Sequence, residues 1–73
     1  MQLAEIIRVT RQKAFLSQES FASEIGVAVS TINRWETGKS KPNLSAMKQI
    51  KQFCENHQLP YEAIEAEWFK KEA

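Results

Sequence analysis

Apolar residues recur at intervals of three and four along almost the whole chain, and no segment alternates apolar with polar residues. The first spacing places apolar side chains on one face of a helix, whereas strict alternation is typical of a strand. Start and stop signals divide the chain into helices expected at about residues 2–14, 18–25, 29–36, 44–56 and 60–69. The sequence therefore predicts an all-α domain of five helices.

The clearest helix boundaries lie in the first half of the chain. Ser17 is a suitable N-cap for the second helix, and Gly26 can end that helix because glycine adopts the left-handed conformation without strain. Only Val27 and Ala28 separate this end from the third helix. Two short helices joined by so tight a turn are typical of a helix-turn-helix.

The second half of the chain gives a fourth and a fifth helix. Asn43 is the expected N-cap of the fourth, and Pro60 suits the first position of the fifth. The apolar face of the fourth helix is expected to consist of Leu44, Met47, Ile50 and Cys54, with Phe53 alongside. His57 is interpreted as a loop residue without a partner.

Length and composition exclude several classes of site. The chain has 73 residues, one cysteine, one histidine and no aspartate. We expect residues 1–73 to form one domain, since chains divide into domains only when they are much longer. A Ser-His-Asp triad, a histidine-cluster metal site and an internal disulfide are excluded within the chain. We therefore expect no enzyme activity, no catalytic residue, no metal and no cofactor, and no small-molecule ligand is evident.

The sequence also indicates where in the cell the protein is located. No apolar run approaches the ~20 residues that span a bilayer, and the chain starts without a signal-peptide pattern. We expect a cytoplasmic protein with no membrane contact.

The net charge of +1 conceals an uneven distribution. Residues 28–54 carry five basic side chains against one glutamate, whereas residues 55–73 carry five glutamates against two lysines. A basic middle segment beside an acidic tail favours a polyanionic partner. The alternative is a solvated surface on which the charges happen to be unevenly spread.

The run from Leu16 to Pro42, LSQESFASEIGVAVSTINRWETGKSKP, resembles the lambda-repressor/Cro-type helix-turn-helix domain of the XRE family. The matching elements, in chain order, are Ser17-Gln18, Phe21-Ala22, Ile25-Gly26-Val27, Ser30-Thr31-Ile32, Arg34-Trp35-Glu36, Gly38-Lys39 and Pro42. The likeness extends over about residues 3–56. It implies a lambda-repressor-like fold and sequence-specific binding of double-stranded DNA.

In such a domain the helix at 29–36 enters the major groove. Helical phase turns Ile32 and Trp35 inward, and the outward residues are predicted to contact bases: Val29, Ser30, Asn33 and Arg34. Asparagine can pair with adenine and arginine with guanine, although both side chains could simply solvate an exposed helix. The resemblance implies phosphate contacts from a further set: Ser17, Gln18, Thr31, Thr37, Lys39 and Lys41.

The resemblance also implies a structural ion pair between Arg11 and Glu36, which would tie the first helix to the end of the third. Two departures from the family pattern stand out. Ala28 replaces the Ser or Thr that usually caps the recognition helix, which forfeits ~1 kcal/mol of capping. Phe15 replaces a common Gly or polar residue.

Residues 57–73 lie beyond the resemblance. We expect Tyr61 and Ile64 to pack inward, and Trp68 and Phe69 to contact a two-fold partner, because exposed aromatic residues often anchor interfaces. The alternative is that the whole helix completes the core of a monomer.

Two functions follow from these observations. The first is a transcriptional repressor that binds a palindromic operator as a homodimer. The second is a protein-interaction module on the same fold, an antitoxin-like partner with weak or no DNA binding.

Overall fold

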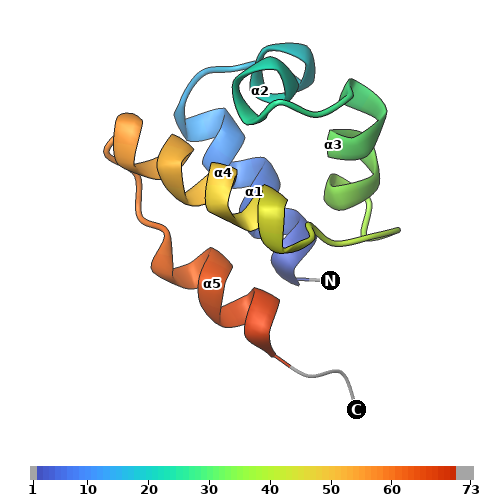
Figure 1. Cartoon of the computed structure of the whole chain (residues 1–73), viewed down its shortest axis with the longest axis vertical. Helices are drawn as coiled ribbons and strands as arrows, with labels where there is room; N and C mark the ends of the chain where they lie inside the picture. The colour runs from blue at the N-terminus through green and yellow to red at the C-terminus, as the bar shows by residue number, and fades with distance from the viewer. Residues whose placement is uncertain (1, 71–73) are drawn as a thin grey trace.

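The computed structural model describes residues 2–70, which form five α-helices and no strand. The helices are α1 (Gln2–Lys13), α2 (Gln18–Ile25), α3 (Val29–Glu36), α4 (Leu44–Asn56) and α5 (Glu62–Phe69) (Figure 1). The predicted all-α fold is confirmed. Among the described residues, no helix is both long and apolar enough to cross a membrane.

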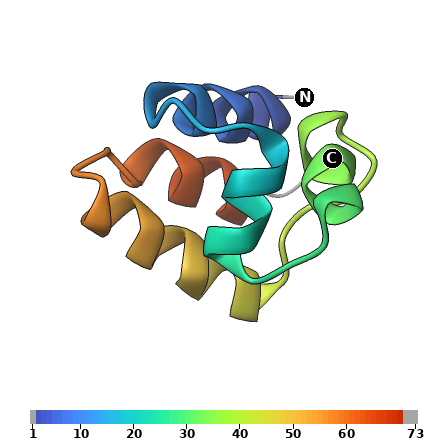
Figure 2. The ribbon, with the colours of Figure 1, turned by 90° about the horizontal axis from the view of Figure 1, so that it is seen from above.

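The five helices enclose a single core. α2 packs against α3 and α4, while α1 packs against α3 and α5. In Figure 2, α1 and α4 run on either side of α5, and α3 lies at the edge of the molecule. The helix predicted to be the recognition helix therefore lies at the edge of the fold and has an exposed outer face.

The core is made of apolar side chains from all five helices: Leu3, Ile7, Phe21, Ala22, Ile25, Ile32, Trp35, Ala46, Met47, Ile50, Phe53, Cys54 and Ile64. Phe21 and Phe53 meet edge to face with ring centroids 4.9 Å apart, a favoured aromatic geometry. Ile64, on α5, is fully buried. The fifth helix is therefore part of the core.

Local capping interactions explain three of the helix ends: the starts of α2 and α4 and the end of α2. The Ser17 hydroxyl accepts a hydrogen bond from the Ser20 amide at 3.1 Å, and Asn43 Oδ1 accepts one from the Ala46 amide at 2.8 Å. Gly26 ends α2 with a φ of 88°. Ala28 makes no side-chain cap to α3. The amides at the start of α3 therefore lack the side-chain acceptor that α2 and α4 have.

Three predictions from the sequence were wrong. Pro60 is not the first residue of the fifth helix, because α5 begins at Glu62 and Tyr61 is its N-cap. Leu44 is 63% exposed, because it is the first residue of α4 and its side chain stays outside the core. His57 has a partner: its Nε2 lies 2.9 Å from Glu24 Oε1, and its ring stacks on Phe53 with centroids 4.3 Å apart. The end of α4 is thereby joined to α2.

Phe15 occupies an unusual position between α1 and α2. Its φ is 60°, and its side chain is 95% exposed. The left-handed region is uncommon for residues other than glycine. Here a phenylalanine adopts it, at the position where the resemblance implies a glycine or a polar residue.

Candidate nucleic-acid interface

The outer face of α3 carries the four residues that were predicted to contact bases. Ile32 and Trp35 are buried, and this places Val29, Ser30, Asn33 and Arg34 on the exposed side of the helix. Thr31, predicted to contact phosphate, is half-buried. The exposed row therefore combines one apolar side chain with three that can form hydrogen bonds to base edges.

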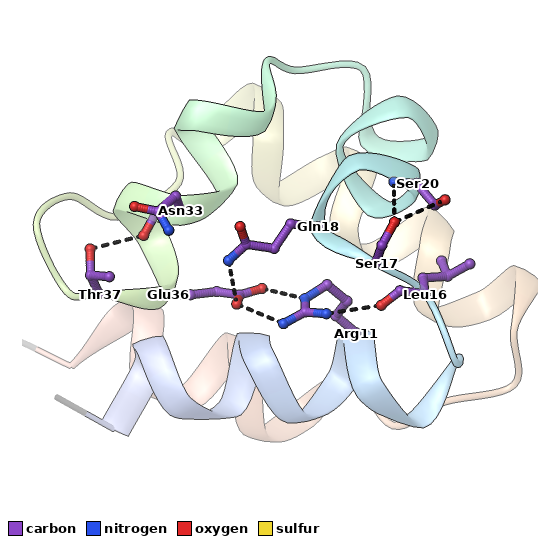
Figure 3. Close-up of polar contacts among 8 residues, drawn as sticks. All are labelled: Arg11, Leu16, Ser17, Gln18, Ser20, Asn33, Glu36 and Thr37. Carbon is purple, nitrogen blue, oxygen red and sulfur yellow. Dashed lines mark hydrogen bonds and ion pairs between the residues drawn. The ribbon is translucent and has the colours of Figure 1, made fainter.

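The C-terminal end of α3 is fixed by an ion pair with α1 (Figure 3). Arg11 Nε lies 2.7 Å from Glu36 Oε2, and Arg11 Nη2 lies 3.0 Å from Oε1. The remaining Nη1 donates to the carbonyl of Leu16 at 2.9 Å. The hydrogen bond with Glu36 raises the pKa of the Arg11 guanidinium above its ordinary value, so Arg11 stays protonated and positively charged. The two oppositely charged residues predicted to pair are brought together in a bidentate geometry.

This ion pair is largely shielded from water. The Glu36 side chain is only 3% exposed and the Arg11 side chain 14%. Gln18 Nε2 adds a third hydrogen bond to the carboxylate, at 3.0 Å from Oε1. The network thus joins α1, the start of α2 and the end of α3. The participation of Gln18 could not be read from the sequence, where its position indicated only a phosphate contact.

The start of α2 and the end of α3 carry hydroxyl groups that already have partners within the chain. Besides accepting from the Ser20 amide, Ser17 Oγ donates to Ser20 Oγ at 3.2 Å. Thr37 Oγ1 donates to the carbonyl of Asn33 at 2.8 Å. Both side chains are exposed, and both also stabilise the helix ends on which they lie.

The loop from α3 to α4 carries two lysines with different surroundings. Lys39 is exposed, and its amide donates to the carbonyl of Arg34 at 2.9 Å. Lys41 is also exposed, but its Nζ lies 5.6 Å from the centroid of the Trp68 ring and 3.5 Å from the Trp68 carbonyl oxygen. Lys41 is therefore directed towards α5.

The two aromatic residues at the end of α5 differ in their surroundings. Trp68 is half-buried, and its Nε1 donates to the carbonyl of Pro42 at 2.6 Å. Phe69 is 65% exposed and meets the Trp68 ring edge to face. Trp68 thus has a contact within its own chain, whereas Phe69 is largely open to solvent. No signal in the sequence could have shown the bond between Trp68 and Pro42, which are 26 residues apart.

Comparisons with known proteins agree with this arrangement. A family model described as "Helix-turn-helix" matches residues 7–55, more than half of the chain. The chain is also 34% identical over 53 residues to the HTH-type transcriptional activator BcrR of Enterococcus faecalis. That match covers 73% of this chain but 26% of the relative, so the chain spans about a quarter of the relative's length. No solved structure matches the chain.

Proposed function

The chain belongs to the XRE-type helix-turn-helix family of DNA-binding transcription regulators, and we propose that it reads a specific double-stranded sequence with the exposed face of α3. The family match confirms the resemblance noted for the run from Leu16 to Pro42. One observation carries the proposal: Asn33 and Arg34 are exposed on a helix whose opposite face is buried and whose end is fixed by the Arg11–Glu36 pair.

The assigned roles follow from side-chain chemistry. Arg34 can donate two hydrogen bonds to guanine and Asn33 can pair with adenine, whereas Val29 can offer only an apolar contact to a thymine methyl group. Ser30 can bond to a base or a phosphate. Such side chains on the exposed face of one helix are what direct readout in the major groove requires.

Phosphate contacts are proposed on both sides of α3. Lys39 is the strongest candidate, because it is exposed and its backbone is hydrogen-bonded to the end of α3. Contacts of this kind contribute affinity without sequence information. The remaining members of the proposed set are Ser17, Gln18, Thr31, Thr37 and Lys41.

The test begins with selection of bound sites from random duplex DNA. On the preferred site, Arg34→Ala should cost ~1–3 kcal/mol of binding free energy and relax the preference at one base pair. Lys39→Ala should weaken binding to all duplexes alike and lower the salt slope by about one. Arg8→Ala, which removes the same charge from α1, is the control.

Two results would count against these assignments. An unchanged site preference in Arg34→Ala would show that Arg34 is not a base reader. An absence of salt-sensitive binding to any duplex would favour the protein-interaction module instead.

We further propose that the protein binds a palindromic site as a homodimer through α4 and α5. A hollow of about 150 Å³ lies between these helices. Leu44 and Phe69, both mostly exposed, line it together with Met47, Tyr61 and Trp68. Lys48 and Lys51 border it on the α4 side and Glu65 on the α5 side. A two-fold arrangement could bring these opposite charges together and cover the apolar residues.

Sedimentation of the intact chain and of Phe69→Ala, with and without duplex DNA, tests the dimer. We expect the intact protein to occupy two half-sites about one helical turn apart. Monomers with one protein per site would contradict the dimer and leave the DNA-binding proposal standing.

Repression stays a prediction, and the similar Enterococcus faecalis protein is named an activator. The position of the selected site relative to a promoter, followed by a reporter assay, would decide the direction of regulation.

A further inference from the structure

We propose that the last turn of α5 holds the loop between α3 and α4 in its DNA-contacting conformation, with Trp68 as the positioning residue. The inference rests on the proposed function, because it assumes that this loop contacts phosphates. It goes beyond that function by giving α5, which lies outside the matched residues 7–55, a role in DNA affinity.

The start of the loop is fixed by backbone hydrogen bonds to α3. The amides of Lys39 and Ser40 donate to the carbonyl of Arg34, at 2.9 and 3.3 Å, and the amide of Gly38 donates to the carbonyl of Trp35 at 3.3 Å. Gly38 has a φ of 78°, which allows the chain to turn away from the helix axis. The first half of the loop is therefore fixed to the recognition helix.

The end of the loop is held from α5. Pro42 is fully buried, and its carbonyl accepts the hydrogen bond from Trp68 Nε1. Figure 2 shows the end of α5 beside the segment that runs from α3 to α4. A buried carbonyl without a partner is costly, and the indole supplies that partner. Because Pro42 directly precedes Asn43, the N-cap of α4, this bond fixes where the loop ends.

Lys41 lies between these two fixed points and also contacts Trp68. Its ammonium group lies over the indole ring, in the range of a cation–π interaction, and close to the Trp68 carbonyl oxygen. One residue of α5 thus touches the loop in three ways. None of these three contacts involves Lys39, the residue on which phosphate binding chiefly depends in our proposal.

A loop that is already ordered loses less conformational entropy when it binds DNA. If the indole donor is removed, the Pro42 carbonyl can regain a partner only by reaching water, so the loop has to shift outward. Lys39 would then be displaced even though it does not touch Trp68.

The decisive variant is Trp68→Phe, which keeps an aromatic ring but cannot donate a hydrogen bond. We expect it to weaken binding to the preferred and a scrambled duplex alike, by roughly 3- to 10-fold, because the loop contacts phosphates and not bases. Tyr61→Phe is the comparison variant: it removes the hydrogen bond that the Tyr61 hydroxyl donates to the carbonyl of Met47 on α4, at 3.4 Å, and leaves the bond from Trp68 to the loop in place. Because Tyr61 and Trp68 line the same hollow of the proposed dimer surface, an effect through the dimer should appear in both variants, and we expect Tyr61→Phe to weaken binding less than Trp68→Phe.

A double-mutant cycle with Lys39→Ala separates positioning from general destabilisation. If Trp68 positions the loop, Lys39→Ala should cost less affinity and change the salt slope less in the Trp68→Phe background than in the wild type. Additive effects of the two substitutions would overturn the proposal. So would equal effects of Trp68→Phe and Tyr61→Phe on DNA binding.

Hydrogen exchange of the amides of residues 38–41 gives a readout that does not need DNA. We expect faster exchange at these amides in Trp68→Phe than in Tyr61→Phe, with circular dichroism showing that both variants remain folded. If the wild-type chain binds no duplex, the proposed function fails, and this exchange measurement still decides whether Trp68 holds the loop. Unchanged exchange in Trp68→Phe would overturn it.

Discussion

The C-terminal end of α3 is supported from two sides by different chemistry. From α1, Arg11 holds Glu36 through a bidentate ion pair that water barely reaches. From α5, Trp68 contacts the loop that follows α3 in two ways. Its indole donates a neutral hydrogen bond to Pro42, and the ammonium group of Lys41 lies over its ring. The first support fixes the helix itself and the second fixes the segment after it.

The difference matters because the two supports fail in different ways. Removal of one partner from a buried ion pair leaves an uncompensated charge in a poorly solvated place, which is strongly destabilising. Removal of a neutral donor leaves an unpaired carbonyl, which costs less and can be relieved by a local shift. We therefore expect loss of the first support to act on global stability and loss of the second to act mainly on the loop.

The largest effect should come from Arg11→Met, which leaves the Glu36 carboxylate with Gln18 as its remaining hydrogen-bond donor in this network. We expect a loss of about 3 kcal/mol in the free energy of unfolding, measured by urea denaturation. The double variant Arg11→Met/Glu36→Leu should lose less than the sum of the two single variants.

Arg8→Ala is the control for that experiment. Arg8 and Glu5 form an exposed pair at 3.9 Å, and such pairs contribute ~0–1 kcal/mol. Simple additivity of the Arg11 and Glu36 substitutions would show that the two residues do not act as a pair.

Alkaline pH should weaken the α4–α5 side while leaving the ion pair intact. Burial raises the pKa of the Cys54 thiol from 9.0 to about 11, and burial also raises the pKa of Tyr61. Because the folded state disfavours the thiolate, the contribution of Cys54 to stability should be constant below pH 9 and fall between pH 9 and about 11. The loss from Cys54 is roughly 2–3 kcal/mol at most. Arg11, with its raised pKa, stays charged in this range.

Urea unfolding at pH 8 and pH 11, on the wild type and on Cys54→Ala, measures this contribution. The variant should show a smaller loss at pH 11, because it lacks the thiol. The same loss in both proteins would show that Cys54 does not titrate between these limits.

Trp68→Phe should have a smaller effect on stability than Arg11→Met at pH 7. The lost hydrogen bond to the Pro42 carbonyl corresponds to ~1–2 kcal/mol in the free energy of unfolding. A loss equal to that of Arg11→Met would show that the ion pair and the Trp68 hydrogen bond contribute equally to stability, and the expected difference between them would be wrong.

The smallest effect should come from Ala28→Ser, at the end of α3 that neither support reaches. A serine there can accept a hydrogen bond from the first turn of the helix, and we expect a gain of ~0.5–1 kcal/mol in thermal or urea melts. Ser17→Ala, which removes an existing cap from α2, should lose a similar amount. A loss in Ser17→Ala without a gain in Ala28→Ser would show that the start of α3 needs no further acceptor.

Much of the fold could be predicted because its signals are local. Ser17, Gly26 and Asn43 act within one turn of their own helices, and the three- and four-residue spacing identified Ile32, Trp35 and Ile50 as core residues. The predictions for Leu44 and His57 were wrong because the surroundings of these two residues are not set by local signals. Spacing shows which face of a helix is apolar, but it does not show how far the core extends or which distant residue lies beside a side chain.

The candidate site likewise has features that could be predicted from the sequence and features that could not. The outward face of α3 follows from helical phase, whereas the pairing of Arg11 with Glu36, 25 residues apart, was expected only from the family resemblance. The contacts of Gln18 with Glu36 and of Trp68 with Pro42 depend on how helices far apart in sequence pack together. Neither the spacing nor the resemblance contained that information. The assignment of individual residues to bases and phosphates stays a prediction.

The burial of Ile64 has a consequence for how this protein can be divided. The stretch shared with other helix-turn-helix proteins ends at residue 55, yet Ile64 fills part of the core from beyond that boundary. A fragment cut at residue 56 would keep the whole motif and still open a hole beside α1, against which α5 packs. We therefore expect the segment that unfolds as one cooperative unit to be longer than the segment that matches the family.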